Sequence, residues 1–341
     1  MSETKDDLDS MEVSIPEESK PLMNIKGIGP KTVQKLIDIG VNTPAHLVAM
    51  PFQDLAALLQ INKKAAREIC NDAIDKFLPD TVHAKSLDDI IIHQKDIVKR
   101  IPTGVTRFDQ AMDGGLPTEA ITIFKGEYES GKSQFCYQLA VNCLKYHKRH
   151  VVWIETESGT FVGTRLLEVA KATGVKVNGS SDMTIVTSDE ASRPQLLYNA
   201  YEMVSRIVKN KNVDVGLLII DSFSAPFKAE YGPRERLPAR SQDETKHLGW
   251  LNEFAKNNNC AIVLTAQIMG LPDTSLSLAE KAKSGHNKKM QGGTTVQHGG
   301  TYLISLEQKS KIQYEGIIFG SPNVPRTAFR FKLTKQGVRD I

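Results

Sequence analysis

The chain is poor in cysteine, and the few it has form no recognisable pattern. Cys70, Cys136, Cys143 and Cys260 are scattered over 341 residues, and no two of them form a C-x-x-C pair. This excludes a disulfide-stapled secreted scaffold and a paired-cysteine zinc site. Cys136 and Cys143 lie two helical turns apart in a segment of helical periodicity, so both are predicted to be buried thiols. We therefore expect a reducing, intracellular setting.

Long apolar runs and a strong net charge are also missing. No run is long enough to cross a bilayer, and the opening Met-Ser-Glu-Thr-Lys-Asp-Asp is no signal peptide, so we expect no membrane partner. The net charge is only +3, so a nucleic-acid surface would have to be local. Charged residues make up 24% of the chain and hydrophobic residues 40%, which is typical of a globular protein.

The most informative motif is a phosphate loop. A short apolar run, Ile121–Phe124, precedes Gly126, and Gly131-Lys132-Ser133 follows after four residues, before a segment with helical spacing. Such a loop turns its N–H groups toward phosphates at a helix N-terminus, with the lysine on the β- and γ-phosphates and the serine hydroxyl on Mg²⁺. We therefore predict an ATP-binding protein that uses Mg²⁺. The residues predicted to bind the nucleotide here are Gly126, Glu127, Tyr128, Glu129, Ser130, Gly131, Lys132, Ser133 and Gln134.

Acidic residues follow two further predicted strands. The apolar run Val215–Ile220 ends in Asp221, which is predicted to help hold Mg²⁺ beside the phosphate loop. The run Val151–Ile154 is followed by Glu155 and Glu157, either of which could polarise the attacking water. Side chains alternate along a strand, and these two fall on the same side, so spacing alone cannot choose between them.

The chain divides into four predicted parts. Residues 1–20 are acidic and read as a disordered tail, 21–79 as a compact helical domain, 80–100 as a linker and 101–341 as an α/β domain. Strands are expected near 121–125, 150–154, 184–187, 216–221 and 260–265, in a mostly parallel sheet covered by helices. From Thr301 onward the residues alternate as antiparallel strands do, at 302–306 and 329–333.

The helical domain carries a glycine-rich turn. Lys26-Gly27-Ile28-Gly29-Pro30-Lys31 precedes a helix expected over Thr32–Ile39, which is typical of a helix–hairpin–helix that binds DNA phosphates through Lys26 and the backbone of Gly27 and Gly29. The alternative is a tight helix–helix corner in which the glycines are needed only for their backbone conformation. Residues 59–64 are interpreted as a degenerate second hairpin.

In this order the elements resemble the RadA-type strand-exchange recombinases, the archaeal and eukaryotic branch of the RecA-like proteins. The resemblance runs from about Ile25 to the C-terminus. It includes Thr103-Gly104, Gly114-Gly115, Thr156-Glu157, the more specific Ala229-Glu230-Tyr231 with its following arginines, and Thr265-Ala266-Gln267. The family implies a RecA-like core with a small helix–hairpin–helix domain, ATP hydrolysis, single- and double-stranded DNA as partners, and self-assembly into a filament or ring. Recombination mediators are possible further partners, and the implied location is with the DNA, in the cytoplasm or nucleoid of a prokaryote or the nucleus of a eukaryote.

The resemblance also implies roles for individual residues. Glu157 matches the family's water-activating glutamate and Gln267 its γ-phosphate sensor. Arg165 matches an arginine stacked on adenine, and Pro325 a proline on the other face of the base, across a subunit boundary. His298 matches a histidine that links nucleotide state to the second DNA loop. The DNA-contacting loop residues implied are Arg234, Arg236 and Arg240 in the first loop, 232–240, and Lys281, Lys283, Lys288 and Lys289 in the second, about 269–294; by composition alone, solvated charged loops are equally compatible.

The chain also departs from the family pattern. Ser158 is inserted after Glu157, Glu235 and Ala266 replace a glycine and an asparagine, and Gly320 stands where the family has an aspartate that caps the neighbour's ATP. In the linker, Thr81 replaces the aromatic residue that docks into the next subunit, with Ala84 in place; Phe77, Val82 and Leu87 are the alternative anchors.

Two functions stay open on this evidence. The first is an active recombinase that forms filaments on single-stranded DNA and promotes homologous pairing and strand exchange. The second is a divergent paralogue that acts as a DNA-binding mediator with weak ATPase and little self-assembly. A hexameric helicase with the same core is a third choice, but it does not explain the helix–hairpin–helix domain and linker.

Overall fold

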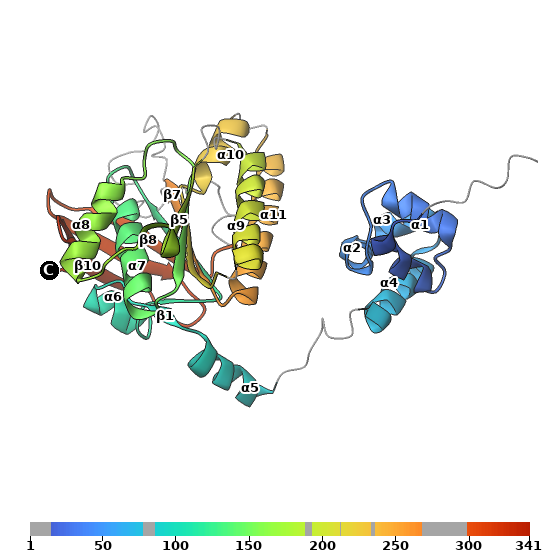
Figure 1. Cartoon of the computed structure of the whole chain (residues 1–341), viewed down its shortest axis with the longest axis horizontal. Coiled ribbons are helices and arrows are strands. Elements are labelled where there is room, and N and C mark those ends of the chain that lie inside the picture. Colours follow the sequence, from blue (N-terminus) through green and yellow to red (C-terminus); the bar gives the residue numbers. More distant parts are fainter. Residues whose placement is uncertain (1–14, 78–85, 188–192, 212, 233–235, 268–298) are drawn as a thin grey trace, which may run out of the picture. The chain divides into compact units, whose positions relative to one another are not determined.

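The computed structural model describes residues 15–77, 86–187, 193–211, 213–232, 236–267 and 299–341. The chain separates into two compact units, 1–90 and 91–341, joined near helix α5 (Leu87–Ile92) (Figure 1). In the described part no helix is long and apolar enough to span a membrane.

The N-terminal unit is a small bundle of short helices. A 3₁₀ helix, η1 (Glu17–Asn24), is followed by α1 (Pro30–Ile37), α2 (Pro44–Ala49), α3 (Phe52–Leu59) and α4 (Lys63–Phe77). Their apolar faces meet in one core that includes Leu22, Val33, Leu36, Leu47 and Leu55. Glu17–Lys20 were expected in a disordered tail, and that boundary is wrong. Here Ser19 is buried and Leu22 draws the segment onto the core.

Both predicted hairpin turns of this unit are present between helices. Gly27 adopts φ +88°, a conformation that glycine favours, and Gly29 caps α1, which begins at Pro30. The Lys26 N–H donates to the Asp72 carboxylate at 2.7 Å, which ties the turn to α4 and lowers the pKa of Asp72. Between α3 and α4, Gln60 is left-handed and the Asn62 side chain accepts from the Ala65 N–H at 2.8 Å. The second turn therefore has its own helix cap.

The C-terminal unit is built on a nine-stranded sheet of order β11-β10-β9-β8-β3-β7-β6-β4-β5. Strands β3 (Ile121–Gly126), β4 (His150–Glu155), β5 (Met183–Thr187), β6 (Val215–Asp221) and β7 (Ala261–Gln267) run parallel, which confirms the predicted mostly parallel sheet. Strand β8 (Tyr302–Gln308) is parallel to β3, and β9 (Gln313–Gly320), β10 (Thr327–Thr334) and β11 (Gly337–Asp340) continue antiparallel. The predicted strands 302–306 and 329–333 are present, but β9 lies between them.

Helices cover both faces of this sheet (Figure 1). On one face α6 (Thr106–Ala111), α7 (Lys132–Tyr146) and α8 (Gly163–Thr173) pack on side chains such as Phe124 and Trp153. On the other face α9 (Pro194–Lys211), α10 (Ser224–Glu230) and α11 (Leu237–Asn257) pack on Ile123 and Ile154. The remaining short elements are the π-helix η2 (His93–Ile97), β1 (Arg100–Ile101) paired with β2 (Leu116–Pro117), and η3 (Gly179–Ser181).

The parallel strands end at one edge of the sheet, and this edge carries the motifs. Gly126, Glu155, Asp221 and Gln267 are the last residues of β3, β4, β6 and β7. Open parallel sheets bind ligands outside the carboxyl ends of their strands. Residues whose positions in the sequence are far apart are therefore brought to one place by the fold.

Candidate nucleotide-binding site

The phosphate loop forms a tight turn between β3 and α7. Gly131 has φ +93° and caps α7, whose first residue is Lys132. A Cβ at Gly126 would lie 2.1 Å from Ser130 Oγ and 2.6 Å from the Leu306 carbonyl oxygen, so only glycine fits there. The loop thus presents an open backbone at the N-terminus of a long helix, where an anion is favoured.

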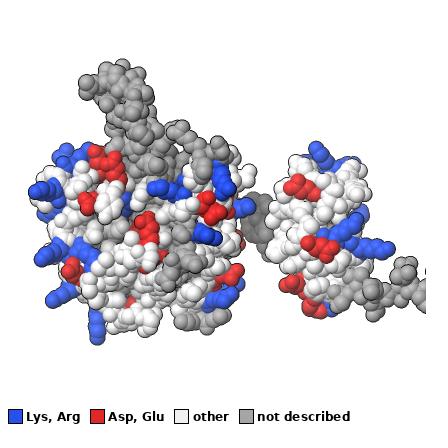
Figure 2. Space-filling model, turned by 90° about the horizontal axis from the view of Figure 1, so that it is seen from above, with Lys and Arg blue, Asp and Glu red and all other residues white. Residues whose placement is uncertain are grey.

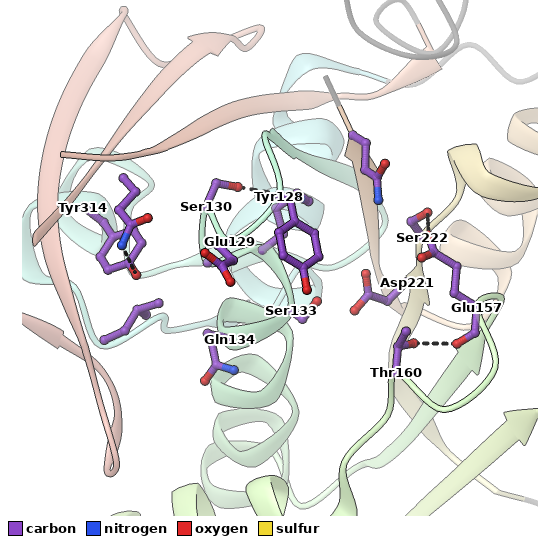
Figure 3. A pocket seen from close by; sticks show the side chains of 15 residues that line it. Tyr128, Glu129, Ser130, Ser133, Gln134, Glu157, Thr160, Asp221, Ser222 and Tyr314 are labelled. Carbon is purple, nitrogen blue, oxygen red and sulfur yellow. Dashed lines mark hydrogen bonds between the residues drawn. The ribbon is translucent and has the colours of Figure 1, made fainter. Parts of the chain in front are cut away.

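A cavity of about 450 Å³ opens above this loop (Figure 3). The phosphate loop lines one side, and the ends of the neighbouring strands line the other. The residues around it are Tyr128, Glu129, Ser130, Gly131, Lys132, Ser133, Gln134, Glu157, Thr160, Asp221, Ser222, Gln267, Gln308, Tyr314 and Leu333.

Lys132 is held inside the loop that it belongs to. Its Nζ donates to the carbonyl oxygens of Gly126 at 3.1 Å and Glu127 at 2.7 Å. Burial lowers the pKa of this ammonium group, and the nearby Asp221 and Glu157 carboxylates oppose that effect. A partly desolvated cation facing two acids is well placed to exchange its carbonyl contacts for phosphate oxygens.

Asp221 and Glu157 stand together on the strand side of the cavity (Figure 3). Asp221 accepts a hydrogen bond from Thr265 Oγ1 on β7. The Ser222 hydroxyl donates to Glu157 Oε1 at 2.9 Å, and the peptide bond between Asp221 and Ser222 is cis. Ser222 therefore orients the glutamate from the end of β6.

Glu155 has a different environment from Glu157. It is only 5% exposed and does not line the cavity; its carboxylate accepts from the Phe161 N–H at 2.6 Å and from Thr160 Oγ1 at 3.3 Å. These bonds fix the turn that follows β4. Of the two glutamates that spacing could not separate, Glu157 is the one at the cavity, in spite of the inserted Ser158.

Gln267 lines the same cavity from the end of β7. Its N–H donates to Ser224 Oγ at 3.3 Å, at the start of α10. Gln267 pairs with Gly126 in the β3–β7 register, so the glutamine is a direct neighbour of the phosphate loop.

Arg165 lies beside the cavity rather than in its wall. Its guanidinium donates to Gln134 Oε1 at 2.9 Å and to the carbonyl oxygens of Thr334 and Lys335 at 2.7 and 2.6 Å. Gln134 does line the cavity, so the contact places Arg165 at its rim. Pro325 is exposed between β9 and β10 and does not line this cavity.

Several cavity residues were not expected from the sequence. Gln308 and Tyr314 come from β8 and β9, and Leu333 from β10. Gln308 Nε2 donates to the Tyr314 hydroxyl at 3.1 Å. No local motif marks them, because they enter the site only through the antiparallel extension of the sheet.

The chemistry of these residues fits ATP with Mg²⁺. Gly126 and Gly131 shape an open backbone cradle, Lys132 supplies a cation, and Ser133 and Asp221 supply the oxygen ligands that Mg²⁺ prefers. In the described residues no group of three or more His, Cys, Asp or Glu could hold a metal unaided. A phosphate-loop Mg²⁺ needs no such group, because the nucleotide and water supply most of its ligands.

The residues predicted to bind DNA fall in different settings. Lys26, Gly27 and Gly29 are exposed on the N-terminal unit, and Arg236 is exposed just before α11. Arg240 was expected on an open loop, and that placement is wrong: residues 237–240 are the first turn of α11, and Arg240 is 8% exposed and paired with Glu244. Arg234, Lys281, Lys283, Lys288, Lys289 and His298 lie outside the described residues.

Charge on the visible surface does not single out one region. Figure 2 shows Lys and Arg side chains scattered over both units and interspersed with Asp and Glu. This agrees with the small net charge of +3. On the face that Figure 2 shows, the described residues therefore form no broad basic surface.

A RecA-like ATPase core is the class that these features define: a parallel sheet with a phosphate loop after one strand, an aspartate at the end of another, and a C-terminal antiparallel extension. Residues 93–341 match the Rad51 family model, and residues 19–75 match the SAM-like helix-hairpin-helix tandem. The chain therefore belongs to the Rad51 family and carries the predicted helix–hairpin–helix unit.

Relatives agree over nearly the whole length. The chain is similar to the DNA repair and recombination protein RadA of Methanococcus maripaludis (strain C5), at 28% identity over 334 residues, covering 94% of this chain and 99% of that protein. It is also 28% identical over 337 residues to the protein of that name from Methanococcus voltae, covering 94% of this chain and all of the relative. At this identity the chain is a divergent member of the family.

Proposed function

We propose that the protein is an ATP-dependent DNA recombinase that assembles on single-stranded DNA and promotes homologous pairing and strand exchange in DNA repair. Membership of the Rad51 family and the names of the RadA relatives support a role in recombination and repair. The protein would then act inside the cell, wherever the DNA is.

The observation that carries the proposal is the single cavity shared by Lys132, Asp221, Glu157 and Gln267. Lys132 would contact the β- and γ-phosphates, while Ser133 and Asp221 would hold Mg²⁺, which neutralises charge on the phosphates. Glu157, oriented by Ser222, would polarise the attacking water and accept its proton. Gln267 would sense the γ-phosphate at the point where the chain leaves β7 toward residues 268–298.

DNA contacts are proposed for both units. On the N-terminal unit, Lys26 with the backbone of Gly27 and Gly29 would hold a phosphate at the N-terminus of α1. On the core, the exposed Arg236 and the lysines and arginines outside the described residues would contact the backbone with little sequence preference. His298 is proposed to relay the nucleotide state to these contacts.

Self-assembly is proposed to use α5. Leu87, Ile90, Ile91 and Ile92 are all exposed on this short helix, Leu87 by 72%. Of the alternative linker anchors, Phe77 packs partly buried against the N-terminal core, whereas Leu87 is free to enter a pocket of a neighbouring subunit. Head-to-tail contacts of this kind generate an open helix when they do not close, and Pro325 would then cover the neighbour's nucleotide next to Arg165.

Electron microscopy of the purified protein with ATP, Mg²⁺ and single-stranded DNA tests the proposal. Regular filaments are expected, together with DNA-stimulated ATP hydrolysis and displacement of a labelled strand from a duplex by a homologous single strand. A protein that binds DNA but stays monomeric under these conditions would instead be a mediator-type paralogue.

A further inference from the structure

A buried polar cluster lies at the start of α11, on the sheet face opposite the phosphate loop. Arg240 Nε donates to Glu244 Oε1 at 2.8 Å, and the two side chains are 10% and 0% exposed. One turn further along α11, His247 is also buried, and its Nδ1 forms a hydrogen bond of 3.2 Å with the Tyr201 hydroxyl of α9. Helices α9 and α11 lie side by side in Figure 1.

The pairing inside this cluster is incomplete. An arginine and a carboxylate can form two parallel hydrogen bonds, but this pair forms one. Arg240 Nη2, Glu244 Oε2 and His247 Nε2 are buried without a hydrogen-bond partner among the described residues. Buried polar atoms are nearly always paired, so three orphans in one cluster call for an explanation. Because the interior offers Arg240 few hydrogen-bond partners, it stabilises the inward position of this side chain only weakly.

The position of Arg240 suggests where else its guanidinium can go. Arg240 lies in the first turn of α11, and the exposed Arg236 precedes that helix directly as its N-cap residue. Both flank the N-terminus of α11, a 21-residue helix whose dipole favours an anion at that end. A phosphate held by Arg236 would therefore lie within the surroundings of Arg240.

We propose that Glu244 is a positioning residue that holds Arg240 inside the core, and that Arg240 leaves this ion pair to contact a DNA phosphate beside Arg236. This inference rests on the proposed DNA-binding function. Glu244 would act as a latch: it keeps the arginine away from DNA until a backbone phosphate offers better partners than a single buried carboxylate oxygen.

Proton binding is linked to the latch. Burial raises the pKa of Glu244 to about 7, with Arg240 opposing the effect and Asp243 adding to it. Burial lowers the pKa of His247 to about 4, so this histidine is neutral near pH 7. Among the described residues, the other titratable groups near the cluster are Tyr198 and Tyr201 of α9, Lys246 of α11, and Tyr231, whose hydroxyl donates to Asp243. Arg240 thus favours the ionised form of Glu244 against the effect of burial.

The sign of the pH effect follows from this arrangement. Arg240 lowers the pKa of Glu244 in the latched state, so departure of Arg240 must raise that pKa further. The released state then binds more protons than the latched state, and a fall in pH favours release. Binding of single-stranded DNA should therefore strengthen between pH 8 and pH 6 by more than in a variant without the latch.

Two measurements test the latch. The first is the reactivity of Arg240 toward phenylglyoxal, read by mass spectrometry in the full chain, with exposed Arg236 as internal reference. Arg240 should be protected in the wild type and reactive in Glu244→Gln. Glu253→Gln removes an exposed carboxylate from the same helix and serves as the matched control; it should leave Arg240 protected. Equal protection in Glu244→Gln and the wild type would overturn the proposal.

The second measurement is affinity for a fluorescent single-stranded oligothymidylate. Glu244→Gln should bind about 5-fold to 150-fold more tightly than the wild type, the usual span of a coupling between two states. In an Arg240→Gln background the same change should have no effect. A gain that persists without Arg240, or that Glu253→Gln reproduces, would refute the latch as its cause.

The two arms separate the latch from the proposed function. Release of Arg240 in Glu244→Gln with no binding of the oligothymidylate by any variant would disprove the DNA-binding function and leave the conformational switch standing. If Glu244→Gln does not fold, the pH profiles of the wild type and Arg240→Gln decide instead. Profiles that are parallel between pH 8 and pH 6 would refute the latch.

Discussion

The two glutamates after β4 should respond differently to the loss of their charge. In Glu157→Gln the side chain keeps its size and its contact with Ser222, but it can no longer accept a proton from water. A positioned general base contributes about 10²-fold to 10⁴-fold to a rate, so DNA-stimulated hydrolysis should fall by that factor, about 3–5 kcal/mol in the barrier. Nucleotide affinity should change little, because Lys132, Ser133 and the loop backbone are untouched.

Glu155→Gln is the matched control, since it alters the same kind of side chain two residues away. Glu155 stabilises the turn through Phe161 and Thr160 instead of facing the cavity. Weakening one buried charge-assisted hydrogen bond costs about 1 kcal/mol of folding stability, which for a domain of this size lowers the melting temperature by about 2–4 °C. Its hydrolysis rate should stay within a few-fold of the wild type.

Phosphate release with saturating ATP and single-stranded DNA gives the rate, binding of a fluorescent nucleotide gives the affinity, and thermal unfolding gives the stability. If Glu155→Gln lost more activity than Glu157→Gln at equal nucleotide affinity, the catalytic assignment would have to move to Glu155. The inserted Ser158 would then have changed which glutamate faces the nucleotide.

Four further substitutions test other parts of the molecule. Lys132→Ala should reduce hydrolysis by at least about 10²-fold, because the phosphates lose their loop cation; unchanged turnover in phosphate release would remove Lys132 from the site. Gly126→Ala should abolish nucleotide binding in a fluorescence titration, since its Cβ would overlap Ser130 Oγ and the Leu306 carbonyl oxygen, and normal affinity would show that the loop can yield. Arg236→Ala and Lys26→Ala should each lower the slope of log K against log salt for single-stranded DNA by about 0.7, with Lys171→Ala on α8 as control; an unchanged slope would mean no phosphate contact.

The parallel core could be predicted because its strands are continuous apolar runs. The runs Val215–Ile220 and Ala261–Ala266 are buried on both faces of the sheet. An unbroken apolar run is therefore enough to predict such a strand, whichever strands lie beside it. Strand β9 could not be seen in this way. It contains Gly316, which lies flat against the Phe329 ring of β10, where any Cβ would come within 2.0 Å of the ring. The need for glycine at this position arises from packing against β10, so the sequence of β9 alone does not reveal it.

The site could be predicted where its residues belong to one short, contiguous motif. The phosphate loop brings glycines, lysine and serine in a fixed order, whereas Tyr314 and Leu333 reach the cavity only through strand pairing. Spacing could not decide between Glu155 and Glu157, because β4 ends at Glu155 and the alternation of side chains does not continue to Glu157. Arg240 was misplaced although a local signal existed: Glu244 follows at i+4, the spacing of a helical ion pair.

The ends of β6 and β7 connect the nucleotide cavity to both proposed DNA segments. Thr265 bonds to Asp221, and the Gln267 N–H bonds to Ser224, so the strand ends are held to each other and to the first residue of α10. Helix α10 leads to Tyr231 and on to Arg236 and the Arg240–Glu244 pair, while β7 leads directly into residues 268–298. A shift of Gln267 on γ-phosphate contact would therefore reach one segment through the backbone of β7 and the other through α10. Because the two routes begin at a single residue, we expect loss of the nucleotide to weaken both proposed DNA contacts together.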